Sequence, residues 1–147
     1  MGNSGIGVPL PELAAYCREA AAEGAVLLKN EGHMLPVKKD ETVSIFGRSQ
    51  IEYYRSGTGS GGAVNVPYVK NILDGIKENN VFPVNEELVE IYQEWLKEHP
   101  FDNGGGGWAA EPWHQAEMEI TDEIARRAAE KSEKAIFLIG RTAGEDK

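Results

Sequence analysis

The sequence is short of cysteine, of basic residues and of long hydrophobic runs, and each shortage excludes a class of protein. Cys17 is the only cysteine among 147 residues, so neither an intrachain disulfide nor a multi-cysteine metal cluster is available. Lys and Arg total 15 against 24 Asp and Glu, and the resulting net charge of −9 disfavours nucleic acid and anionic membrane surfaces as partners. The apolar run 135–139 falls far short of the ~20 residues that cross a bilayer.

A targeting signal is also missing from the beginning of the sequence. Residues 1–8 contain no basic stretch followed by an apolar one, so no secretory signal peptide is visible. Ile6 stands where N-myristoylation requires Ser or Thr. We therefore expect a cytoplasmic protein without a nucleic-acid or membrane partner.

Apolar residues recur at helical spacing in several segments. The clearest pattern runs from Leu88 to Leu96, with apolar residues at i, i+3, i+4, i+7 and i+8. Pro11 suits the first turn of one helix, and Thr121 is a good N-cap for another. The sequence predicts helices over about 11–23, 67–79, 85–98 and 121–132.

Three short segments, 25–29, 43–47 and 135–140, are almost entirely apolar. Strands of this kind are buried on both faces, which is typical of a parallel sheet covered by helices. We therefore expect an α/β fold with a mainly parallel sheet flanked by helices in a three-layer sandwich. Three strands are few for such a sheet, so we also expect the sheet to be incomplete in this chain and to expose an apolar edge.

Residues 100–120 show no periodicity and contain four consecutive glycines, Gly104 to Gly107. Irregular segments of this length inside a domain are usually functional or disordered. Trp108, Trp113 and His114 are candidate sugar-binding residues, because an indole can stack on a pyranose ring and an imidazole can bind its hydroxyls. The alternative is that both tryptophans only hold this segment against the rest of the protein.

Two further patterns are weaker. Gly57, Gly59 and Gly62 formally match the dinucleotide fingerprint G-x-G-x-x-G, but ten residues separate them from the strand that ends at Phe46, so nucleotide binding is disfavoured. The alternative is a flexible glycine loop that binds nothing. The three histidines are too widely spaced for a metal site, and we expect no cofactor.

Glu145 follows the apolar segment 135–139 through the small residues Thr142, Ala143 and Gly144. A carboxylate on a loop after a buried strand can face a cleft, where partial desolvation makes it a competent proton donor. The alternative is an exposed acid beside Asp146.

Several segments together carry the motifs of one known family: 22–36, with the run E-G-A-V-L-L-K-N and the pair Leu35-Pro36; the strand 43–47; the glycine loop 57–61; and the strand and turn 135–144. Together these segments resemble the α/β sandwich domain of glycoside hydrolase family 3. Val37 replaces the usual Leu. The resemblance spans residues 12–147 and leaves 1–11 as an N-terminal lead.

The resemblance implies a retaining, exo-acting β-glucosidase-like enzyme that acts on a small neutral β-glycoside or oligosaccharide. Glu145 matches the family's general acid/base, and Gly59 lies in the glycine loop expected to face the same cleft. Arg141 belongs to the matched motif but receives no catalytic role. The family motif continues toward Asp-Arg, whereas this sequence ends with Asp146-Lys147.

The family's nucleophile is an Asp of a (β/α)₈ barrel, which this sequence lacks, so the partner expected for the sandwich is the remainder of the same polypeptide. Because the sandwich motif begins near the first residue, we expect the subgroup in which the sandwich precedes the barrel. The isolated chain is then expected to be inactive, and homo-oligomerisation stays open. The alternative function is a non-catalytic carbohydrate-binding module.

Overall fold

The computed structural model describes residues 10–53 and 68–142, which divide between two units, one ending at Val37 and one starting at Lys38. The first unit contains the helix α1 (Pro11–Glu23), with Pro11 in its first turn as expected. After it, the Asn30 side chain closes a turn through two hydrogen bonds to the Leu35 backbone. Its amide oxygen accepts from the Leu35 N–H and its amide nitrogen donates to the Leu35 carbonyl, both at 2.9 Å.

The strand expected over 25–29 is wrong, because residues 25–30 form no strand. A strand requires a neighbour whose backbone N–H and C=O groups pair with its own, and the described residues of this unit provide none. The apolar side chains of Val26, Leu27 and Leu28 accordingly stay between 61% and 92% exposed.

The second unit contains a parallel pair of strands, β1 (Val43–Phe46) and β2 (Lys134–Phe137). Their register sets Val43 opposite Lys134 and Phe46 opposite Phe137. On its other side β1 forms a parallel bridge with Val84, so β1 is flanked on both sides. The expected parallel pairing is confirmed, although both strands end earlier than expected.

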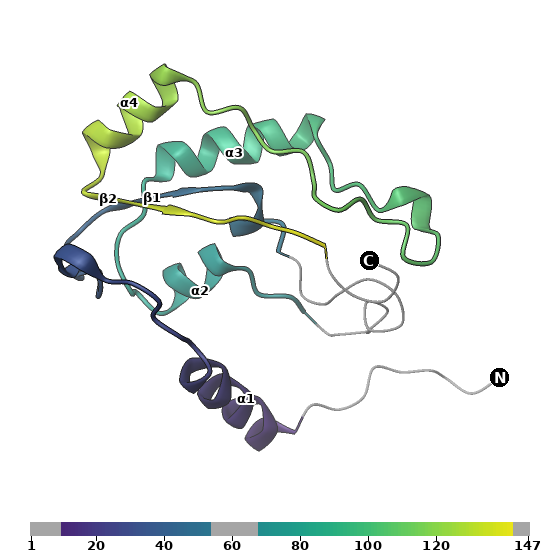
Figure 1. The fold of residues 1–147 in the computed structure, drawn as a ribbon, viewed down its shortest axis with the longest axis horizontal. Helices are drawn as coiled ribbons and strands as arrows, with labels where there is room; N and C mark the ends of the chain where they lie inside the picture. The colour runs from purple at the N-terminus through teal and green to yellow at the C-terminus, as the bar shows by residue number, and fades with distance from the viewer. Residues whose placement is uncertain (1–9, 54–67, 143–147) are drawn as a thin grey trace. The chain divides into compact units, whose positions relative to one another are not determined.

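Helices cover both faces of this sheet. The helices α3 (Glu86–Glu98) and α4 (Asp122–Lys131) lie on one face, and α2 (Ile72–Glu78) lies on the opposite face (Figure 1). The expected α/β architecture is therefore confirmed. The helix α2 begins at Ile72 rather than near 67, because the Asn71 side chain accepts from the Asp74 N–H at 2.7 Å and completes a capping box. Among the described residues, no helix is long and apolar enough to span a bilayer.

The main core lies between β1 and the helices α3 and α4. Its buried side chains are those of Phe46, Leu88, Tyr92, Met118 and Ala128. Burying a large apolar side chain of this kind contributes about 1.5–3 kcal/mol. The ring of Phe46 also stacks on that of Phe137, with 4.8 Å between centroids, which joins the two strands at their carboxyl ends.

Gly47, directly after β1, has a conformation that only glycine adopts easily. Its φ is +102°, and a Cβ there would lie 2.2 Å from the Leu138 carbonyl oxygen. The Gly47 N–H donates to the Tyr92 hydroxyl at 2.8 Å. Burial raises the pKa of Tyr92 above its ordinary value. The carboxyl end of β1 therefore depends on the close approach of the Gly47 backbone to that of Leu138.

Gly47→Ala is expected to destabilise the protein by about 2–5 kcal/mol, because backbone strain and overlap with Leu138 add together. The matched control is Gly75→Ala within α2, where a Cβ meets nothing within 4 Å. That control is expected to stabilise the protein by about 0.5–1 kcal/mol. Denaturant unfolding of both variants checks the contrast, and a Gly47→Ala protein as stable as wild type would contradict it.

At the other end of the strands, an ion pair joins Glu41 to Lys134 at 2.6 Å, with both side chains less than a fifth exposed. The hydrogen bond from Lys134 holds the pKa of Glu41 below its ordinary value. Because this pKa is lower in the folded than in the unfolded state, the stabilisation is present above the ordinary value of 4.5 and is lost as the pH falls through the folded-state pKa.

Glu41→Gln is expected to lower the melting temperature near neutral pH, and the deficit is expected to disappear in acid, where Glu41 is protonated in both states. Thermal unfolding of both proteins across this range measures the deficit. The control is Glu31→Gln, which removes an exposed pair with Lys29 and is expected to change little at any pH. A deficit independent of pH would count against the role of the Glu41 charge.

Candidate functional site

The carboxyl ends of β1 and β2 define one edge of the sheet. The 3-10 turn η2 (Arg48–Gln50) follows β1, and residues 138–142 follow β2. The connection between α3 and α4 lies at the same end of the sheet (Figure 1). Loops at this edge carry the functional residues of parallel α/β sheets, so we consider it the candidate site.

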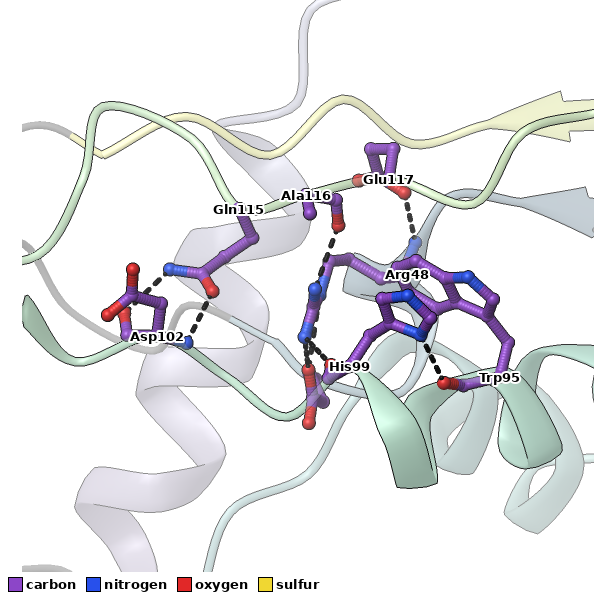
Figure 2. Close-up of polar contacts among 8 residues, drawn as sticks. Arg48, Trp95, His99, Asp102, Gln115, Ala116 and Glu117 are labelled. Atoms are coloured by element: carbon purple, nitrogen blue, oxygen red, sulfur yellow. Dashed lines mark hydrogen bonds and ion pairs between the residues drawn. The ribbon is translucent and has the colours of Figure 1, made fainter.

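The connection between α3 and α4 is irregular, as expected, apart from the short turn η4 (Gly104–Gly106). The Gln115 side chain closes it at its base. The Gln115 amide oxygen accepts from the Asp102 N–H at 2.7 Å, and its amide nitrogen donates to the Asp102 carbonyl at 2.9 Å (Figure 2). Residues 102–115, hereafter the 102–115 loop, therefore have their ends held together like an Ω-loop.

Arg48 links three segments at this edge, and its side chain is only 3% exposed. Its guanidinium donates to the Ala116 carbonyl at 2.8 Å and to the His99 carbonyl at 2.9 Å (Figure 2). It also donates to the Glu52 carboxylate. The Arg48 backbone N–H donates to the Glu117 carboxylate at 2.9 Å. One side chain thus joins the end of β1, the end of α3 and the segment that follows the 102–115 loop.

The surroundings of Arg48 satisfy its charge. Its guanidinium carbon lies 5.4 Å from the centroid of the Trp95 ring, and the His99 ring stacks on the same indole at 4.2 Å. A guanidinium over an aromatic face gains cation–π attraction, and Glu52 supplies the opposite charge. The His99 side chain stays exposed while its ring packs on Trp95.

Thr142 anchors the segment that follows β2. It is 4% exposed. Its backbone N–H donates to the Trp113 carbonyl at 2.8 Å, and its hydroxyl donates to the Pro112 carbonyl at 2.5 Å. The 102–115 loop and the chain leaving the sheet are therefore tied together two residues before Gly144.

A pocket of about 490 Å³ opens beside these contacts. It is lined by residues on both sides of the site: His114, Gln115, Ala116, Glu117, Leu138, Ile139, Gly140 and Arg141. Imidazole, carboxylate and guanidinium groups can bind the hydroxyls of a neutral sugar. Among the described residues, no three His, Cys, Asp or Glu side chains gather as a metal site.

The structure brings some of the sequence-predicted site residues together. His114 lines the pocket, and Trp113 contacts the site through its carbonyl. Trp108 is 62% exposed and is not among the residues that line this pocket. Gly59 and Glu145 lie outside the described residues. That these two residues face one cleft therefore stays a prediction. The sugar-binding roles of these residues stay predictions.

Sequence reasoning missed Arg48, Gln115 and Thr142. Arg48 carried a readable signal, because it is a charged residue two positions after a buried strand. Gln115 and Thr142 carried none, since their partners are backbone groups 13 to 30 residues away.

Comparisons with known proteins agree on one family. The model of the glycosyl hydrolase family 3 C-terminal domain matches residues 25–147. A β-glucosidase of Ruminococcus albus is 51% identical over 128 residues, covering 87% of this chain, and β-glucosidase A of Butyrivibrio fibrisolvens is 34% identical over 86% of it. The chain spans only 13% and 15% of the lengths of these relatives.

Solved structures give the same result. A β-glucosidase from Paenibacillus barengoltzii superposes with a TM-score of 0.92 at 66% identity, covering 99% of this chain and 16% of that one. β-Glucosidase 3B from Thermotoga neapolitana, in complex with glucose, superposes with a TM-score of 0.76 at 31% identity, covering 94% of this chain and 19% of that one. Since the family model and these superpositions cover most of the sequence, the chain belongs to glycosyl hydrolase family 3 and matches its C-terminal domain.

Proposed function

We propose that this chain forms part of a retaining, exo-acting β-glucosidase and supplies the general acid/base, Glu145, together with part of the sugar site. Its substrate is a small neutral β-glycoside or oligosaccharide. The named relatives support this proposal, because they are β-glucosidases and one was solved with glucose. The rest of the enzyme, including the nucleophile, comes from a barrel domain that we propose follows the sandwich. A cytoplasmic location stays a prediction.

The observation that carries the proposal is the anchoring of Thr142 at the carboxyl edge of the sheet. Two hydrogen bonds to the 102–115 loop hold this residue, which precedes Glu145 by three positions. A chain that leaves a fixed point can present a carboxyl group at a reproducible place. The adjoining pocket, lined by His114 and Arg141, supplies polar groups for a sugar.

In the proposed reaction, an ionised carboxylate of the barrel attacks the anomeric carbon as the bond to the leaving oxygen breaks. The Glu145 carboxyl group donates its proton to that oxygen, so the leaving group departs as a neutral alcohol. The resulting Glu145 carboxylate then takes a proton from the water molecule that attacks the glycosyl-enzyme. Glu145 returns to its protonated form, and the nucleophile is released as a carboxylate.

In the full-length enzyme, Glu145→Gln is expected to reduce turnover of cellobiose, an unactivated disaccharide, by about 10²–10⁴-fold. Formation of the glycosyl-enzyme from dinitrophenyl glucoside is expected to be much less affected, because dinitrophenolate leaves without a proton. Added azide is expected to restore the second step, because it attacks without base assistance. Steady-state kinetics with the two substrates, with and without azide, measure these effects.

The matched control is Asp146→Asn, which removes the neighbouring carboxylate and is expected to leave the turnover of both substrates unchanged. Normal cellobiose hydrolysis by Glu145→Gln would show that Glu145 is an exposed acid and that the proton donor lies elsewhere in the enzyme.

The isolated 147-residue chain is expected to hydrolyse no aryl β-glucoside above background, because it lacks the nucleophile and loss of a catalytic carboxylate costs several powers of ten in rate. Circular dichroism verifies that the sample is folded. Robust turnover by this chain would overturn the proposed division of labour. The alternative, a non-catalytic carbohydrate-binding module, predicts tight saturable glucose binding in a tryptophan fluorescence titration of the same sample.

A further inference from the structure

We propose that Arg48 is a positioning residue for the proton donor, acting through the 102–115 loop and Thr142. This proposal rests on the proposed function of Glu145. Arg48 lies two residues after β1, and its hydrogen bonds reach Glu52, His99, Ala116 and Glu117. The 102–115 loop lies between His99 and Ala116 in the sequence and connects these contacts to Thr142.

The first step of this connection is the contact from Arg48 to the segment that follows the loop. The guanidinium donates to the Ala116 carbonyl and the backbone N–H donates to the Glu117 carboxylate, so two consecutive residues are fixed to the end of β1. The same guanidinium holds the His99 carbonyl, three residues before Asp102. Arg48 thus fixes the chain on both sides of the 102–115 loop.

The second step is the closure of the loop itself. Gln115 is 5% exposed and pairs with the backbone of Asp102 through two hydrogen bonds (Figure 2). Gly104 tightens the loop further: its φ is +62°, and a Cβ there would lie 1.9 Å from the Ala110 carbonyl oxygen. Because its base is held so closely, a displacement of Ala116 moves the loop rather than being absorbed by it.

The third step connects the loop to Thr142. The carbonyls of Pro112 and Trp113 accept the two hydrogen bonds that hold Thr142. Those carbonyls lie three or four residues from Ala116. A shift of the loop therefore shifts the point from which the chain continues toward Glu145.

Lysine does not replace arginine in this arrangement. The Arg48 guanidinium donates in three directions at once, to Ala116, His99 and Glu52, while its plane lies over the Trp95 ring. A lysine ammonium keeps the charge but lacks the planar fork that reaches all three acceptors. Arg48→Lys therefore keeps a cation at the site while loosening the loop.

The experiment uses the full-length enzyme and compares kcat/KM for cellobiose with kcat/KM for dinitrophenyl glucoside. A misplaced proton donor slows only the reaction that needs its proton, and a displacement of about 1 Å can cost about 10²-fold. Arg48→Lys is expected to lower kcat/KM for cellobiose by about 10- to 100-fold and to change that for dinitrophenyl glucoside by less than about 3-fold.

Thr142→Val serves as a second, independent variant. It removes the hydroxyl bonded to Pro112 but keeps the side-chain shape, and the same substrate-dependent loss is expected on a smaller scale. It decides the question if Arg48→Lys fails to fold. The control is Arg126→Lys on α4, whose exposed pair with Glu130 lies outside the site, and it is expected to leave both rates unchanged.

Three outcomes separate the proposals when Glu145→Gln is measured alongside. A substrate-dependent loss in Glu145→Gln and in the positioning variants supports both proposals. If Glu145→Gln shows this loss but the folded Arg48→Lys and Thr142→Val proteins are slowed equally on both substrates, or are not slowed, only the role of Arg48 is overturned. Absence of this loss in Glu145→Gln overturns the proposed function and the positioning role together.

Discussion

The parallel pairing of β1 with β2 is the constraint on which the site depends. Because the two strands run in the same direction and Phe46 lies opposite Phe137, the residues that follow both strands emerge together at one edge. The N–H of Leu138 still donates to the Phe46 carbonyl at 2.9 Å, which keeps the backbones close beyond the last paired residues. Only glycine at position 47 allows this approach, since a Cβ would meet the Leu138 carbonyl. An antiparallel pairing would send the two following segments to opposite ends of the sheet.

Polar contacts, rather than a hydrophobic core, order the loop at this edge. The core lies between β1 and the helices α3 and α4, whereas Trp108 and Trp113 in the loop are both more than half exposed. Hydrogen bonds to a charged group contribute about 1.5–3 kcal/mol each, more than neutral ones. The buried guanidinium of Arg48 and the carbonyls that surround it therefore depend on each other, because each would be costly to bury alone.

Local patterns allowed the fold to be predicted further than the site. The periodicity between Leu88 and Leu96 and the cap at Thr121 identified α3 and α4 nearly to their ends, because both signals act over a single turn or face. The apolar segment 25–29 was misread as a strand, since an apolar run does not reveal whether a neighbour exists to pair with it. The start of α2 was misplaced because the Asn71 capping box overrides the apolar spacing before it.

Long-range contacts explain why the site was harder to predict. Arg48 donates to carbonyls 51 and 68 residues further along the chain, and every residue type offers a carbonyl, so no pattern of side chains marks those partners. His114 was predicted to bind sugar from the chemistry of its side chain; it lines the pocket, and its sugar-binding role stays a prediction. Side-chain chemistry can thus suggest which groups could meet a ligand, whereas contacts to backbone carbonyls leave no such signal in the sequence.

Holding groups in place matters more in the proposed enzyme than in a single-domain one. Retaining hydrolysis requires two carboxyl groups about 5–5.5 Å apart, and a productive site tolerates displacements of only about 0.5 Å. When the nucleophile belongs to another domain, the position of the proton donor relative to it accumulates the looseness of both domains and of the loop that carries the donor. Thr142 is bonded twice to the 102–115 loop, which Arg48 and Gln115 hold at its base, and this fixes the point from which the chain continues toward Glu145. The packing of one domain on the other then sets where that fixed point lies relative to the nucleophile, and this packing is a property of the whole enzyme.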